Sequence, residues 1–216
     1  MLLGGQFNLA RLLSYALVML IAMTIHEYAH NYVADKMGDP TPRQMKRLTL
    51  NPMVHIDWFG WLMWVVVGFG TLGYAIINPR YMRNQRWGYL LAVAAGPFSN
   101  LLLAAFAAIL FRIGIWRFDY FGARDIIPNF NQIMTVWFSL NLLLFLFNLI
   151  PLYPLDGWKV LLMLLPPRES AQVARYERES YFVLIGLILL TLIGVGVLGW
   201  VINPPFNFLT RVLLGF

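Results

Sequence analysis

The chain has 216 residues, of which 60% are hydrophobic and only 12% are charged. Soluble domains carry about 25% charged residues, so this composition argues against a water-soluble fold and favours an integral membrane protein. The net charge of +6 comes from basic residues between apolar runs, which favours contact with anionic lipid headgroups over nucleic acid. Because the chain has no cysteine, a metal ion would need His, Asp or Glu ligands.

Apolar stretches of membrane-spanning length follow one another along the chain, at 7–34, 58–77, 88–111, 133–155 and 181–202. Each is about long enough to cross roughly 30 Å of hydrocarbon as a helix. The piece 206–216 is shorter, and we expect an interfacial helix or tail there. Since no soluble domain is appended, we predict a single membrane-embedded domain over residues 1–216, an all-α polytopic helical bundle.

The sequence His26-Glu27-Tyr28-Ala29-His30 lies near the end of the first stretch. Residues i and i+4 share one face of a helix, so both imidazoles can reach the same ion, and Glu27 can contact a water on that ion. Polar side chains at the end of an apolar run cost energy in lipid unless they are paired or bind a ligand. The pattern therefore predicts a zinc site, because zinc accepts imidazole ligands.

A third ligand is needed, and the candidates are Asp35, Asp39, His55, Asp57 and Asp156. Asp156 follows the fourth stretch directly, in a segment where Pro151, Pro154 and Gly157 break the helix. A broken membrane helix frees backbone groups, and an acidic residue at such a break is a functional candidate. The residues alone favour Asp156 and leave the other candidates open.

Four segments occur in a fixed order along the chain: HEYAH, NPMVHID, AGPFSN and FNLIPLYPLDG. In a hydrophobic chain this combination resembles the site-2 protease family of intramembrane zinc metalloproteases, over about residues 15–165. The resemblance implies zinc ligands at His26, His30 and Asp156. It also implies Glu27 as general base and Asn148 as a substrate or oxyanion contact. The family's usual LDGG reads LDG-Trp158 here, and the chain carries no PDZ or CBS domain.

The shared ion constrains the topology of the chain. The ends of the first and fourth stretches can meet on one side only if the segment around 58–78 does not cross the bilayer, so we expect it to be re-entrant or β-hairpin-like. Then 35–87 and 156–180 share a side with eleven Lys and Arg, against five on the other side. This asymmetry places the site towards the cytoplasmic face, in a membrane that we expect to be the prokaryotic plasma (inner) membrane.

Two weaker site candidates remain. His55 could be an auxiliary ligand near the entrance or a structural histidine, and Asn100 could orient a metal helix or simply pack between helices. Part of the segment 58–77 is rich in Gly and β-branched residues, and an extended edge there could hold an unwound substrate as an added strand.

The favoured function is a zinc protease that acts on single-span transmembrane proteins. The main alternative is a metal-ion or small-solute transporter that uses the same His and Asp residues. An inactive membrane scaffold and another HExxH peptidase, with a Glu as third ligand, also stay open.

Overall fold

The computed structural model describes residues 8–67, 70, 73–122 and 125–215. Over these residues the chain is mostly helical, and the β-pairing within them is an isolated antiparallel bridge between Ile56 and Gly73. The α-helices are α1 (Leu9–Lys36), α2 (Thr41–Gln44), α3 (Pro52–His55), α4 (Trp58–Val67), α5 (Gln85–Arg112), α6 (Phe130–Asn148), α7 (Asp156–Leu164), α8 (Pro167–Val173), α9 (Glu177–Leu192) and α10 (Val197–Leu214). Short 3₁₀ turns, η1 (Pro79–Tyr81) and η2 (Ala174–Tyr176), join some of them.

Each of the three long helices α1, α5 and α6 begins at an asparagine. The side-chain oxygens of Asn8, Asn84 and Asn129 each accept a hydrogen bond from the backbone N–H three residues further on. The side-chain oxygen of Gln132 accepts in turn from the backbone N–H of Asn129, which completes a capping box. These side chains satisfy N–H groups that have no partner within the helix, and they fix where each long helix starts.

These same three helices are long and apolar enough to cross a membrane. In contrast, α4 has ten residues and is therefore about 15 Å long, too short to span about 30 Å of hydrocarbon. The prediction of an all-α polytopic membrane protein is confirmed, and the described part of 58–77 contains no spanning helix. The expected hairpin falls partly on residues 68–69 and 71–72, outside the described residues.

The core lies between α1, α5 and α6, which pack against one another. One apolar cluster joins Val18 and Ala22 of α1 to Val136 and Leu140 of α6. A second cluster joins small residues of α5 to large ones of α6 and α10, namely Ala104, Ala107, Ala108, Phe138, Leu142, Phe145 and Leu214. Small residues allow the backbones of membrane helices to approach closely, which favours this packing.

The fifth apolar stretch is not a straight span. The structure ends α9 at Leu192, and α10 begins at Val197 after a bend of 89°. Gly194 has a positive φ of 92°, a backbone conformation that glycine adopts without steric cost and that ends the helix. The prediction of one continuous span over 181–202 is therefore wrong, and 206–214 belongs to α10, which packs on α5 and α6 rather than forming a separate tail.

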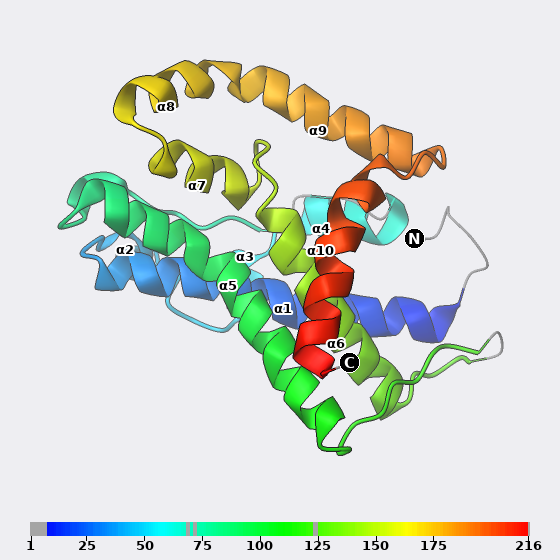
Figure 1. Ribbon diagram of the computed structural model, residues 1–216. Coiled ribbons are helices and arrows are strands. Elements are labelled where there is room, and N and C mark those ends of the chain that lie inside the picture. Colours follow the sequence, from blue (N-terminus) through cyan, green and yellow to red (C-terminus); the bar gives the residue numbers. More distant parts are fainter. Residues whose placement is uncertain (1–7, 68–69, 71–72, 123–124, 216) are drawn as a thin grey trace.

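Figure 1 shows α7, α8 and α9 following one another as an arm at one end of the bundle, with α10 returning across α5 and α6. Hydrogen bonds hold the arm at each end of α7. The backbone N–H of Tyr153 donates to Ser180 Oγ of α9 at 2.9 Å. At the other end of α7, the Arg86 guanidinium donates to the carbonyls of Met163, Leu164 and Leu165 at 2.8, 3.3 and 2.6 Å. These carbonyls lie at the C-terminus of α7, where helical carbonyls lack partners within the helix.

Replacing Arg86 with leucine should destabilise the protein by about 1.5–3 kcal/mol, because hydrogen bonds from a charged donor would be lost and the α7 carbonyls would stay unpaired. Thermal unfolding in detergent micelles measures this effect. The exposed Arg80 of the preceding turn η1 is the control, and Arg80→Leu should change stability by less than about 0.5 kcal/mol. Equal effects of both substitutions would refute the role given to Arg86.

Candidate metal centre

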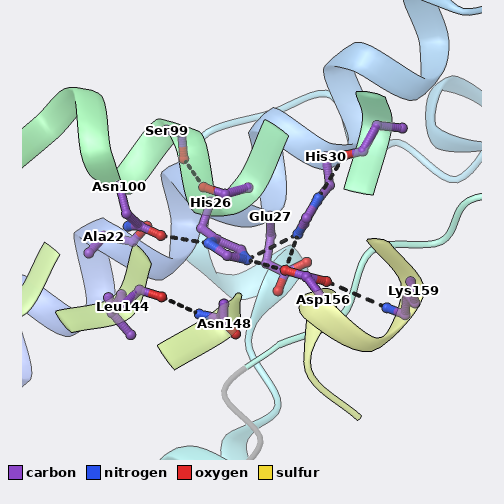
Figure 2. A network of polar contacts seen from close by, with 12 residues as sticks. Ala22, His26, Glu27, His30, Ser99, Asn100, Leu144, Asn148, Asp156 and Lys159 are labelled. Atoms are coloured by element: carbon purple, nitrogen blue, oxygen red, sulfur yellow. Dashed lines mark hydrogen bonds and ion pairs between the residues drawn. The ribbon is translucent and has the colours of Figure 1, made fainter. Parts of the chain in front are cut away.

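Three buried side chains from two helices meet at one point (Figure 2). His26 and His30 are one helical turn apart on α1, and Asp156 is the first residue of α7. The Nε2 atoms of the two histidines are 3.0 Å apart, and each lies 3.1 Å from Asp156 Oδ2. The predicted convergence of the ends of the first and fourth stretches is therefore present in the structure.

The hydrogen bonds of the other ring nitrogens define which atoms face the centre. His30 Nδ1 lies 2.8 Å from the backbone carbonyl of Ala92, which can only accept, so Nδ1 carries the proton. His26 Nδ1 lies 2.6 Å from Asn100 Oδ1, which also accepts. Both Nε2 lone pairs therefore face the Asp156 carboxylate, and a positive charge is needed between these three atoms. A proton satisfies a pair of them, whereas a divalent cation satisfies all three.

The spacing of the three atoms suits zinc. Ligands at about 2.0–2.1 Å from a tetrahedral zinc ion lie roughly 3.3 Å from one another, close to the separations found here. The glycine at position 96 of α5 leaves the necessary room, since a β-carbon there would overlap the His30 ring and lie 2.7 Å from His26 Nε2. The two imidazoles and the carboxylate could hold the ion and leave a fourth position open.

Glu27 is buried beside this group, with 5% of its surface exposed. Within the described residues, its Oε2 atom has no hydrogen-bond partner. A buried carboxylate oxygen without a partner is costly, so this atom is suited to a water or substrate group in the centre. Gly73 packs against Glu27, and a β-carbon there would come within 3.1 Å of Glu27 Cγ and 2.8 Å of the His55 carbonyl.

Lys159 is a neighbour of the centre that the sequence analysis did not identify. Its Nζ lies 3.6 Å from Asp156 Oδ1, the carboxylate oxygen that does not face the histidines. The ammonium group of Lys159 favours the ionised form of Asp156, which is the form that can act as a metal ligand. The sequence feature that could have indicated Lys159 is its position three residues after Asp156, about one helical turn.

Asn100 and Asn148 both lie close to the centre, in different ways. Asn100 is fully buried on α5 and binds His26, as expected for a residue that orients a metal ligand. Asn148 lines the same cavity as His26 and Asp156, and its Nδ2 donates to Leu144 O of its own helix at 2.9 Å. An amide has a second N–H, so the predicted contact of Asn148 with substrate stays a prediction.

The remaining histidine and aspartates have other partners. His55 is buried, and its Nε2 donates to Thr49 O at 2.7 Å, so its auxiliary role also stays a prediction. Asp35 forms an ion pair with Arg43, and Asp57 accepts from the backbone N–H of Phe59. Asp39 is buried and accepts backbone N–H bonds from Thr41 and Asn78 at 3.0 and 2.6 Å, which ties two loops together. In the described residues, the metal-capable group contains Asp156 and none of these four.

A cavity of about 810 Å³ adjoins the centre. Its walls are mainly apolar and come from α1, α4, α6, α9 and α10, with residues such as Met19, Trp64, Leu140, Ile188 and Ile202. His26, Glu27, His30 and Asp156 line it as well, so the polar centre is reached from an apolar chamber. Such an arrangement can receive an apolar segment and present it to the charged groups.

The fold and the site together define a polytopic helical membrane protein with a buried His–His–Asp group that can bind a metal ion. The chain is 38% identical over 173 residues to a Bacillus subtilis (strain 168) protein named "Putative zinc metalloprotease YwhC", and the match covers 80% of this chain and 78% of that protein. The chain therefore belongs to the same family as this metalloprotease. No family model matches the chain. No solved structure matches it either.

Proposed function

We propose that this protein is an intramembrane zinc protease of the site-2 type, which hydrolyses peptide bonds of single-span membrane proteins. The observation that carries the proposal is the position of the His26, His30 and Asp156 group on the wall of an apolar cavity, next to Glu27, whose Oε2 has no hydrogen-bond partner within the described residues. The helices that form this cavity include α1 and α6, both long enough to cross a bilayer. The name of the Bacillus relative supports zinc as the metal.

His26, His30 and Asp156 would hold the zinc ion, which when bound polarises a carbonyl and makes a coordinated water more acidic. Glu27 accepts the proton of the attacking water at its carboxylate and passes it to the leaving amine. Its burial and its Oε2 suit this role, because no hydrogen bond from the described part of the chain competes for that atom. Asn148 donates its second N–H to the oxygen on which negative charge develops.

The substrate is a single-span transmembrane protein that enters the cavity from the lipid. A helix hides its peptide bonds in internal hydrogen bonds, so it has to unwind before Glu27 and the metal can act on it. Residues 73–78 are non-helical, and Gly73 lies beside Glu27. Because Gly73 already pairs with Ile56 in a β-bridge, this stretch is suited to hold an extended substrate as an added strand.

The protein resides in the prokaryotic plasma membrane with its centre towards the cytoplasm. In this topology the segments 35–87 and 156–180 lie on the same side of the membrane as the metal ligands. They carry seven and four Lys and Arg residues, respectively. Cytoplasmic loops carry such an excess of Lys and Arg, and anionic headgroups attract it.

Reconstitution with a single-span substrate tests the proposal. The purified full chain in liposomes should cut a single-span test protein within its apolar segment, and mass spectrometry of the fragments locates the cut. A zinc chelator should abolish the cleavage, and added zinc should restore it. Zinc-loaded protein that cuts no single-span protein from a panel, or that cuts only outside the apolar segments, would overturn the proposal. Zinc transport across these liposomes would favour the transporter alternative instead.

A further inference from the structure

A chain of two buried amides runs outward from the metal centre, from α5 to α6. Asn100 Oδ1 lies 2.6 Å from His26 Nδ1, and Asn100 Nδ2 lies 3.0 Å from Asn141 Oδ1. Asn141 Nδ2 in turn donates to the backbone carbonyl of Trp137 at 2.9 Å. Both asparagines have 0% of their surface exposed, so water does not compete for these bonds.

The Trp137 carbonyl, at the far end of this series of hydrogen bonds, sets the direction of every bond in the series. The Trp137 carbonyl can only accept, so the amide nitrogen of Asn141 points to it and the Asn141 oxygen points to Asn100. The Asn100 nitrogen then faces Asn141, with the backbone carbonyl of Ala22 as a second acceptor at 3.5 Å. The Asn100 oxygen is left for His26, where it accepts from Nδ1–H.

We propose that Asn141 and Asn100 are positioning residues that act in series, so that α6 selects the His26 tautomer with its proton on Nδ1 and its Nε2 lone pair towards the metal. A flipped Asn100 amide would present a donor to His26 Nδ1 and would favour the tautomer that cannot bind metal through Nε2. Outer partners of this kind fix the orientation of metal-binding histidines and typically change metal affinity about 10- to 100-fold. This inference rests on the proposed zinc centre.

The relay is the series of hydrogen bonds from Asn141 through Asn100 to His26. The zinc affinity of the metal-free full chain, measured by chelator competition in detergent, tests this relay without any protease assay. Asn100→Leu should weaken zinc binding about 10- to 100-fold, because the acceptor for His26 is lost. Asn100→Asp should retain affinity near that of the wild type, because a carboxylate still accepts from Nδ1–H. Asn141→Leu should weaken binding about 2- to 10-fold, the change expected for the loss of one net hydrogen bond.

The double variant separates a relay from ordinary packing. A carboxylate offers an acceptor whichever way it turns, so it needs no alignment by Asn141. Asn141→Leu should therefore cost zinc affinity in the wild-type background and leave it unchanged in the Asn100→Asp background. Ser139→Ala is the matched control on α6, because the Ser139 hydroxyl donates within its own helix to Thr135 O, and zinc affinity should not change.

The relay is overturned if Asn100→Leu binds zinc as tightly as the wild type, or if Asn141→Leu has the same cost in both backgrounds. A wild-type protein that binds no zinc would refute the metal centre itself, so the two failures are distinguishable. Because Asn100→Asp retains the hydrogen bond to His26, its affinity and the double variant test the relay even if Asn100→Leu does not fold.

Discussion

Replacing Gly96 with alanine should abolish zinc binding although no ligand is changed. A β-carbon at this position of α5 would overlap Nε2 and Cε1 of His30 and lie 2.7 Å from Nε2 of His26. Both imidazoles would have to rotate away from the point that they share with Asp156. We expect zinc affinity to fall by more than about 100-fold. This exceeds the loss of affinity that follows removal of one hydrogen-bond partner of a metal-binding residue.

Zinc content after purification, measured by elemental analysis, checks this prediction. Gly186→Ala in α9 is the matched control, since nothing lies within 4 Å of a β-carbon there and the residue is helical. The clash at residue 96 involves the ends of side chains rather than backbone, so the helical content of Gly96→Ala should equal that of the wild type in circular dichroism. A variant that binds a full equivalent of zinc would contradict the geometry described for the centre.

Replacing Glu27 with glutamine should separate metal binding from catalysis. Glutamine has nearly the same shape but accepts no proton, so zinc should remain bound while cleavage falls by on the order of 10²–10⁴-fold. The test combines zinc content with cleavage of a single-span protein in liposomes. Comparison of membrane-protein fragments in cells with the wild type and with Glu27→Gln would then identify natural substrates.

The same substitution distinguishes the protease from the transporter alternative. A transporter that passes ions between His26, His30 and Asp156 does not need a general base, so Glu27→Gln should leave transport intact. Glu169→Gln, at the exposed start of α8, serves as a matched control for the loss of one carboxylate and should keep full cleavage. If Glu27→Gln cleaved as fast as the wild type, the assignment of the general base would be wrong.

The metal-binding group could be predicted because its signals are local in the sequence. His26 and His30 are four residues apart and therefore share one helical face. The prolines before Asp156 end a membrane helix, which leaves the carboxylate at the helix end. The requirement that the ligands meet then predicted that the segment after His55 would not span, and α4 is indeed too short.

The parts that could not be predicted depend on tertiary register or on backbone conformation. The run 181–202 is apolar throughout, and its hydropathy does not distinguish a straight span from the bend that Gly194 allows. Arg86 and Lys159 cannot be distinguished from other helix cations until α7 is placed against α5 and the centre. Likewise, Asn141 stands in an apolar run, and only the packing of α6 on α5 distinguishes it from Asn148.

The third ligand comes from a helix that lies 126 residues after His30 in the chain. A nascent chain that has inserted α1 alone has two imidazoles but lacks the carboxylate that completes the centre. Since Arg86 and Ser180 hold the two ends of the segment that carries Asp156, the ligand set is complete only after α5, α6 and α9 are in place. Synthesis order thus keeps the metal centre incomplete until the later helices have been made.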